Sequence, residues 1–250
     1  MKVDKREQKI ISLLESKGEL RLNELSEQLD ISLSTLRKNL AVMKEKGLVI
    51  RTYGGVMSVN RVPDETFDSK LTKNVQEKQQ IAAAARTLLK DDLTIALGSG
   101  TSIYTLASLL YDLQGLAVYT NSLPTAEQLA RCKTLDVHIC GGIIRSHTGT
   151  ITGSEAREYF STLSLDYAFI SCDAIDSRGV IYSDNLAVAT SEQAVLNSAK
   201  HKYILCDSSK LGKTAVARIS RLEDCDGLIT CRASRGISES FRALTEIIYG

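Results

Sequence analysis

From residue 77 onward, short apolar runs alternate with longer stretches of helical periodicity. The runs have the length of strands, far below the ~18 residues of a membrane span, and strands that alternate with helices form a mostly parallel sheet covered on both faces. The expected strands are 93–97, 116–120, 137–140, 168–172, 203–206 and 227–230, and the expected helices are 78–90, 103–110, 124–131 and 187–199. Residues 77–250 are therefore predicted to form an α/β domain, which ends in a helical tail over 238–249.

Polar and small residues follow the carboxyl ends of five of these strands, where ligands bind in open parallel sheets. They are Gly98-Ser99-Gly100-Thr101-Ser102, Asn121-Ser122, Gly141-Gly142, Asp173 and Asp207-Ser208-Ser209-Lys210. The sequence therefore predicts a ligand site at this edge of the sheet.

The loop from Gly98 to Ser102 points to a phosphate ligand. Its glycines allow the backbone to approach a ligand closely, and N–H groups at the start of the next helix attract anions. It is neither a Walker A loop nor a G-x-G-x-x-G motif, because no lysine follows and Ile103 replaces the third glycine. A turn that merely caps the helix is the alternative. Lys210 favours phosphate, because it supplies a countercharge from another strand end.

Several residues nearby keep a simpler explanation open. Asp173 either faces the ligand or caps a turn, and Asp184 and Asn185 are better explained as helix caps. Arg145 either faces an anionic ligand or lies exposed in a hairpin. His138, within an apolar strand, is best explained as a buried residue of the core.

The first sixty residues follow a different pattern, with three short helices and a hairpin. Helices are expected at 4–17 (ended by Gly18), around Leu22, Leu25 and Leu29, and from the N-cap Ser32 through Leu36, Leu40 and Met43 to Gly47. The second and third helices are about three residues apart, which is helix-turn-helix spacing. Strands at 48–52 and 56–59 around Gly54-Gly55 complete a winged helix-turn-helix over residues 3–58, with its motif at about 20–39.

The third predicted helix carries the chemistry of DNA recognition. Its exposed N-terminal half holds Ser34, Thr35, Arg37 and Lys38. A recognition helix enters the major groove by this end, and Arg51 in the wing is placed to reach a phosphate or the minor groove. Residues 1–60 hold 11 Lys and Arg against 8 Asp and Glu, so the positive excess lies at this end of the chain. The alternative is a solvated charged helix on a small all-α domain.

Six cysteines form no C-x-x-C pair, and the three histidines do not stand at metal-ligand spacing from them. They are interpreted as small buried residues of a reduced protein that binds no metal. No N-terminal apolar segment is present, so a cytoplasmic location without a membrane partner is expected.

Motifs throughout the chain resemble the DeoR family of bacterial transcriptional regulators. They are Ser32-Leu33-Ser34-Thr35-Leu36-Arg37-Lys38-Asn39-Leu40, Gly47-Leu48, Arg51, Gly54-Gly55, SGTS, TNSL, GGIIR, TITGSEA, DYAFIS and DSSKLGK. The resemblance implies an effector domain similar in fold to ribose-5-phosphate isomerase and the glucosamine-phosphate deaminases. It also places residues 67–73, part of a predicted linker over 60–76, against that domain.

The resemblance implies a DNA-binding regulator, most readily a repressor, of a sugar catabolic operon, controlled by a phosphorylated sugar. The expected partners are double-stranded operator DNA, the sugar phosphate and further copies of the chain in a dimer or tetramer. Neither a cofactor nor a catalytic residue is expected. The family's Arg-Arg-Asp triplet is Arg37-Lys38-Asn39 here, and Gly98 replaces a common Asp, so neither operator nor sugar carries over from the family.

Pattern and resemblance together give two sets of expected site residues. The DNA-binding set is Ser32, Ser34, Thr35, Arg37, Lys38, Asn39, Arg51 and Tyr53. The effector-binding set is Gly98, Ser99, Gly100, Thr101, Ser102, Asn121, Ser122, Gly142, Asp173 and Lys210.

Two other functions remain open at this point. One is a sugar-phosphate isomerase or deaminase with an appended DNA-binding domain, and the other is a structural module with a vestigial pocket. An isomerase needs an acid/base carboxylate that faces the sugar. Asp173 is one candidate, and the sequence shows no second carboxylate motif with the spacing of such an enzyme.

Overall fold

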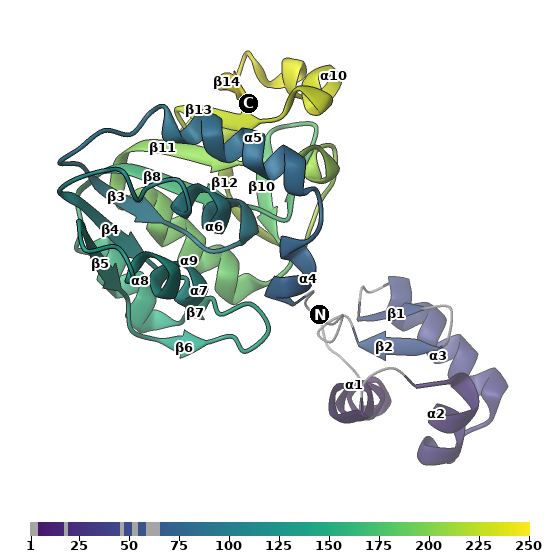
Figure 1. Cartoon of the computed structure of the whole chain (residues 1–250). Coiled ribbons are helices and arrows are strands. Elements are labelled where there is room, and N and C mark those ends of the chain that lie inside the picture. The colour runs from purple at the N-terminus through teal and green to yellow at the C-terminus, as the bar shows by residue number, and fades with distance from the viewer. Residues whose placement is uncertain (1–4, 18–19, 46–47, 52–54, 59–65) are drawn as a thin grey trace. The chain divides into compact units, whose positions relative to one another are not determined.

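The structure, a computed structural model, describes residues 5–17, 20–45, 48–51, 55–58 and 66–250. The chain divides into two units, Met1–Asp64 and Glu65–Gly250, drawn in Figure 1. Gly18, Gly47, Tyr53 and Gly54, which carried predictions, lie outside the described residues, as do positions 3–4, 52 and 59–65 of the predicted ranges.

The first unit is a winged helix-turn-helix, as predicted. Its elements are α1 (Lys5–Lys17), α2 (Leu22–Leu29), α3 (Leu33–Glu45), β1 (Val49–Arg51) and β2 (Val56–Ser58). Helices α1 and α3 pack on the antiparallel hairpin, and α2 packs on these two helices. The shared core includes Ile10, Leu14, Leu25, Leu36, Leu40, Met43, Val49 and Val56. The three-residue link from α2 to α3 begins at Asp30, whose left-handed φ of 51° turns the chain.

Seven strands, all parallel, form the central sheet of the second unit, as the alternation of apolar and helical runs predicts. Their spatial order is β14-β13-β11-β8-β3-β4-β5. In chain order they are β3 (Thr94–Leu97), β4 (Leu116–Thr120), β5 (Leu135–Ile139), β8 (Leu165–Ser171), β11 (Ala199–Leu205), β13 (Gly227–Thr230) and β14 (Glu246–Tyr249).

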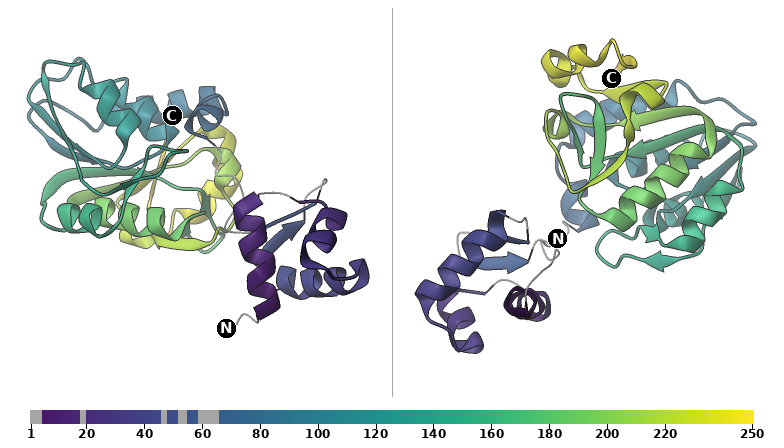
Figure 2. Two further views of the ribbon diagram at one scale, coloured as in Figure 1. Left: turned by 90° about the horizontal axis from the view of Figure 1, so that it is seen from below. Right: turned by 180° about the vertical axis from the view of Figure 1, so that it is seen from behind.

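Helices cover both faces of this sheet, and an apolar core fills each side. One face is covered by α5 (Val75–Arg86), α6 (Thr101–Ala107) and α7 (Leu123–Leu129), of which α5 and α6 lie in front in Figure 1. The other face, seen from behind in Figure 2, is covered by α8 (Ser154–Ser161) and α9 (Leu186–Asn197). A small antiparallel sheet of β12 (Ala217–Arg221), β10 (Val180–Ser183) and β9 (Ala174–Ile175) also packs there.

The end of the chain was predicted to be helical, and this prediction is wrong for most of its length. Only the short turns α10 (Arg235–Ser238) and η5 (Glu239–Phe241) are helical, and Glu246–Tyr249 forms the edge strand β14. β14 pairs in parallel with β13, from Gly227↔Glu246 to Thr230↔Tyr249. Backbone pairing to an open sheet edge, with β-branched Ile247 and Ile248, outweighs the helical spacing of the apolar residues.

Residues 66–76, within the range predicted to be a linker, hold α4 (Phe67–Leu71) and the start of α5 in the second unit. The side chain of Thr66 caps α4 by accepting a hydrogen bond from the backbone N–H of Ser69 at 3.2 Å. Asn74 directly precedes α5, and its backbone has the left-handed conformation with φ 51°.

A carboxyl group is buried beneath the loop that follows β3. Glu192, on α9, is 1% exposed. Its Oε1 accepts hydrogen bonds from the backbone N–H of Ser99 at 2.9 Å, the Ser99 hydroxyl at 2.7 Å and Nδ2 of Asn121 at 3.1 Å. Its Oε2 has no hydrogen-bond partner among the described residues. Burial raises the pKa of Glu192 to about 7, although these hydrogen bonds lower it.

Replacement of Glu192 by Gln should change how stability depends on pH. The pKa of about 7 lies above the ordinary 4.5, so the folded chain binds this proton more tightly than the unfolded chain. Wild-type stability should therefore fall as pH rises between these two values, by roughly 3 kcal/mol from this group. The glutamine of Glu192→Gln does not titrate. The unfolding free energy of the variant minus that of wild type should therefore rise between pH 4.5 and about 7, and stay constant above this interval.

Chemical denaturation of both proteins at several pH values between about 5 and about 8 measures this difference. The cost of burying an amide in place of the carboxyl is the same at every pH and does not affect the slope. Identical pH dependences of the unfolding free energy for the two proteins would contradict the raised pKa of Glu192.

Candidate functional site

Hydroxyl side chains build the N-terminal end of α3. The Oγ of Ser32 accepts a hydrogen bond from the backbone N–H of Thr35 at 3.3 Å, which confirms the predicted N-cap. The same Oγ lies 3.0 Å from the hydroxyl of Ser34 and 2.9 Å from that of Thr35. Three hydroxyls therefore gather at the positive end of this helix.

Burial along α3 divides it into two faces. Arg37 and Lys38 are exposed, whereas Leu36 is completely buried. Asn39 differs from the two basic residues, because it is half-buried and its Nδ2 is enclosed without a partner among the described residues. Arg51 is exposed at the end of β1. The structure thus brings the hydroxyl and basic residues together at one end of α3, with Arg51 on the hairpin.

The strand order reverses between β3 and β8. The chain runs from β3 through β4 to β5 on one side, and then continues from β8 to β11, β13 and β14 on the other. Ligands bind beyond the carboxyl ends of strands at such a switch point. The loop at 98–102 follows β3 and Asp173 follows β8, so the topology brings two of the predicted elements to this point.

The loop after β3 is tightly enclosed. A Cβ on Gly98 would lie 2.2 Å from Oε2 of Glu192, and one on Gly100, whose φ is +108°, would lie 2.3 Å from Oγ of Ser171. That Oγ donates a hydrogen bond to the carbonyl oxygen of Ser99 at 2.9 Å, which ties the ends of β3 and β8 together. Packing therefore accounts for both glycines.

Backbone donors are available where α6 begins. The first intrahelical hydrogen bond runs from the N–H of Tyr104 to the carbonyl oxygen of Gly100 at 3.0 Å, so the N–H groups of Thr101 and Ser102 have no helical acceptor. Both side chains are buried, and the Ser102 hydroxyl has no partner among the described residues.

Three other predicted site residues have structural roles. The Ser122 hydroxyl caps α7 by accepting from the backbone N–H of Thr125 at 3.4 Å. Asn121 is fully buried and supports Glu192. Gly142 begins the β6–β7 hairpin (Ile143–Ile144 with Ile151–Thr152), where a Cβ would lie 2.4 Å from the carbonyl oxygen of Thr152. These residues shape the edge of the sheet on which the loop at 98–102 lies.

Asp173 is fully engaged at the end of β8. Its Oδ1 forms an ion pair with Nζ of Lys70 at 3.0 Å, and its Oδ2 accepts from the Ser183 hydroxyl and the backbone N–H of Asp184, both at 3.0 Å. Burial raises the pKa of Asp173, but the charges of Lys70 and Lys210 and the hydrogen bonds lower it more, to about 2. The side chain is therefore a carboxylate at neutral pH.

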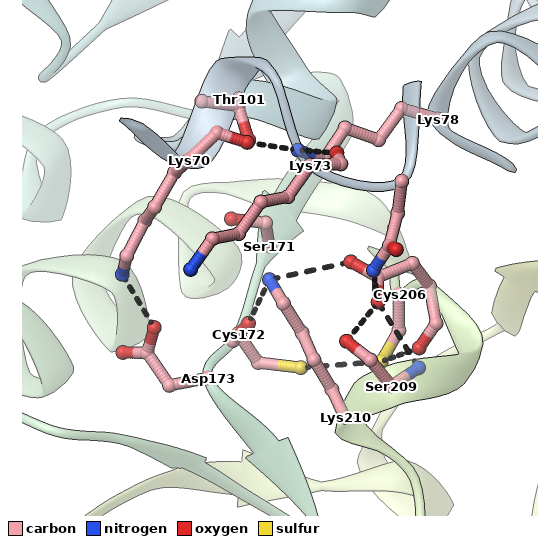
Figure 3. A network of polar contacts seen from close by, with 12 residues as sticks. Lys70, Lys73, Lys78, Thr101, Ser171, Cys172, Asp173, Cys206, Ser209 and Lys210 are labelled. Carbon is pink, nitrogen blue, oxygen red and sulfur yellow. Dashed lines mark hydrogen bonds and ion pairs between the residues drawn. The ribbon is translucent and has the colours of Figure 1, made fainter. Parts of the chain in front are cut away.

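Lys210 is the basic residue predicted at this edge of the sheet. Its Nζ donates to the carbonyl oxygen of Cys172 at 2.7 Å and lies 3.9 Å from Oδ2 of Asp207 (Figure 3). Burial lowers the pKa of Lys210, but the acidic groups around it, including Asp207 and Asp173, raise it by more. It therefore carries a charge although it is largely enclosed.

Three more lysines lie around the same strand ends. Figure 3 shows the side chains of Lys70 and Lys73 reaching toward the space between Asp173 and Lys210. Lys78, 4% exposed, donates to the backbone carbonyls of Lys70 and of Lys73, the latter at 2.7 Å. These three lysines were not among the predicted site residues. For Lys70 the reason is that α4 has no apolar period and that its contact with Asp173 spans 103 positions of sequence.

Within the part of the chain that the structure describes, no three His, Cys, Asp or Glu side chains are grouped as a metal site requires. No helix in the same residues is long and apolar enough to cross a membrane.

Comparison with known proteins matches a DeoR-like helix-turn-helix domain to residues 6–62 and a DeoR C terminal sensor domain to residues 73–232. The lactose phosphotransferase system repressor of Lactococcus lactis subsp. lactis is 33% identical over 92% of this chain and 91% of its own length. The glycerol-3-phosphate regulon repressor of Haemophilus influenzae is 28% identical over 95% and 92% of the two chains.

Among solved structures, ribose 5-phosphate isomerase A of Methanocaldococcus jannaschii is similar over 56% of this chain and 55% of its own, with 18% identity and a TM-score of 0.42.

Both units of this chain match domains of one family in the order expected, and a relative with one third of its residues identical spans nearly the whole length. The chain belongs to the DeoR family of transcriptional regulators.

Proposed function

We propose that this chain is a DNA-binding repressor of a sugar catabolic operon and that a phosphorylated sugar controls its affinity for DNA. The observation that carries the proposal is the group of four lysines at the switch point of the sheet, in a chain that also has a winged helix-turn-helix. The named relatives are repressors, one of a lactose phosphotransferase system and one of a glycerol-3-phosphate regulon.

For DNA, the proposal assigns contact to the N-terminal end of α3. Exposed Arg37 and Lys38 suit a base edge or phosphate, and the hydroxyls of Ser34 and Thr35 suit phosphate or base. Arg51 suits a phosphate beside the groove. The half-buried Asn39 is a weaker candidate than its basic neighbours.

For the effector, the proposal assigns the phosphate to the backbone of the loop at 98–102, Thr101, Ser102 and Lys210. Lysine is a point charge with three donors, which suits a phosphate oxygen. Ser122 and Gly142, which hold neighbouring loops in place, are left to a supporting role. Asp173, already paired with Lys70, is a candidate for the sugar only if that pair opens.

Such a regulator works where its operator DNA is, so a cytoplasmic location is part of the proposal. A dimer or tetramer is a further part, because a single winged helix-turn-helix with a small positive excess binds DNA weakly.

Arg37→Ala should weaken specific DNA binding by about 1–3 kcal/mol if Arg37 contacts a base in a bidentate manner. The fold should persist, because Arg37 lies outside the buried face of α3. Affinity for a duplex selected from a random pool by the wild-type protein, at fixed salt, measures the effect. Arg131→Ala, which removes an exposed arginine of the second unit, is the control. Equal affinities for the Arg37 variant and wild type would remove Arg37 from the interface.

Lys210→Met removes the charge and keeps much of the side-chain volume. A charge-assisted hydrogen bond contributes about 1.5–3 kcal/mol, so affinity for the sugar phosphate should fall roughly ten- to a hundredfold. DNA affinity without effector should stay close to wild type. Calorimetry with the sugar phosphate that most stabilises the wild-type protein measures the first quantity. Exposed Lys213→Met is the control. Wild-type affinity in the Lys210 variant would direct attention to Arg145 as the partner of the phosphate.

The full chain should sediment as a dimer or tetramer at micromolar concentration, because paired DNA half-sites require paired modules. Analytical ultracentrifugation measures the mass. A mass near the 27.3 kDa of one chain, together with tight operator binding, would rule out this part of the proposal.

A further inference from the structure

Helix α4, the first helix of the second unit, is fixed to the loops around the candidate effector site. The backbone N–H of Phe67 donates to the carbonyl oxygen of His147 at 2.8 Å, and its ring meets that of Tyr104 edge-on, with centroids 5.2 Å apart. Tyr104 belongs to α6, which begins at the predicted phosphate loop. The start of α4 therefore touches the hairpin at 143–152 and the helix that would hold the phosphate.

The segment after α4 is fixed to the end of β11. Nδ2 of Asn74 donates to Oδ1 of Asp207 at 3.0 Å. The carboxylate of Glu77 accepts from the backbone N–H and the hydroxyl of Ser208, both at 2.9 Å. Since Lys210 lies on the same short turn, η2 (Ser208–Lys210), residues 66–78 contact both sides of the switch point.

Within this segment, Lys70 is held by a contact that an anion can replace. Its ion pair with Asp173 is only partly enclosed, with the two side chains 33% and 22% exposed. Asp173 keeps two other hydrogen bonds, from Ser183 and from Asp184, when Lys70 leaves. A phosphate dianion carries more charge than the carboxylate of Asp173. Figure 3 shows that the side chains of Lys70 and Lys210 approach the same region beside Asp173.

The backbone of the same turn of α4 has a second attachment. The ammonium of Lys78 binds the carbonyl oxygens of Lys70 and Lys73, which fixes the C-terminal end of α4 to α5. Lys70 thus holds the last turn of α4 in two ways, through its backbone carbonyl to Lys78 and through its side chain to Asp173. The side-chain contact is the one that an anion can replace, and the N-terminal end of the same short helix leads along the chain to the DNA-binding unit.

We propose that Lys70 exchanges its ion pair with Asp173 for the phosphate of the effector, and that helix α4 thereby couples effector binding to DNA binding. The proposal rests on the function proposed above and names the regulation of the same site. Coupling between two sites is reciprocal, so it is measured as the ratio of DNA dissociation constants with and without saturating effector. If Lys70 contacted the phosphate equally in the DNA-bound and DNA-free states, its removal would weaken effector binding without changing this ratio.

The test compares full-length wild type, Lys70→Met, Lys70→Arg and Lys200→Met. Lys200 is the matched control, because it also pairs with an aspartate, Asp166, at 3.5 Å. This pair lies at the amino ends of β8 and β11, away from the carboxyl ends that carry the candidate site. The probes are inorganic phosphate, ribose 5-phosphate, glucose 6-phosphate and fructose 6-phosphate, and the DNA is the duplex that effector-free wild type selects from a random pool. Melting temperatures establish that each variant is folded.

In wild type, the best sugar phosphate should change the DNA dissociation constant by about 5- to 150-fold, the usual range of such coupling. In Lys70→Met, the ratio should approach one even when the effector is saturating. DNA affinity without effector should change less than about threefold, because Asp173 keeps its hydrogen bonds from Ser183 and Asp184 and the ion pair is partly exposed. Lys70→Arg, which keeps the charge, should restore most of the ratio, and Lys200→Met should match wild type.

Two results would overturn the exchange. One is a wild-type ratio in Lys70→Met at saturating effector, and the other is loss of the ratio in a folded Lys70→Arg to the same degree as in Lys70→Met. Failure of the proposed function looks different, because wild type itself would then bind none of the sugar phosphates or show no effect of them on DNA binding. In that case the role of Lys70 falls with it.

Discussion

Parallel pairing of β3 with β8 is the contact on which the sensor site depends. It joins Ile95 to Tyr167 and Leu97 to Phe169, across 72 positions of sequence. From this pair the chain adds its later strands outward on two opposite sides of the sheet, β4 and β5 beside β3, and β11, β13 and β14 beside β8. The loops that follow β3 and β8 are therefore neighbours at the carboxyl ends of the strands. The hydrogen bond from Ser171 to Ser99 and the support of Glu192 beneath the loop both follow from this arrangement.

Charge balance at that edge explains why the site suits an anion. Lys70 and Lys210 hold the pKa of Asp173 down, although its burial acts in the opposite direction. Buried charges are tolerated when they are paired and hydrogen-bonded, and Lys210 meets this condition through Asp207 and the Cys172 carbonyl. Lys73 and Lys78 add two further ammonium groups around these strand ends, and a phosphate would be attracted by these positive charges.

Local periodicity predicted most of the fold, because burial on a strand or helix leaves a repeat in the sequence. It failed at β14, where Phe241, Leu244 and Ile248 fit a helical spacing but an open sheet edge decides the structure. It also failed for α4 and Glu192. α4 is five residues long, and its partners are remote in sequence, so no local pattern marks Lys70. Glu192 lies within an apolar helix, where only the tertiary fold reveals that its carboxyl supports Ser99.

Burial of the cysteines has a practical consequence for labelling chemistry. Five of the six thiols are buried, and burial raises the pKa of Cys140 to about 11 and that of Cys225 to about 12. Maleimides react with thiolates, so these side chains are poor targets. Cys132 is the partly exposed thiol, and it lies just before β5, at the opposite edge of the sheet from the lysines. A fluorophore attached there would give a reporter on the unmodified sequence, with the sensor residues left untouched.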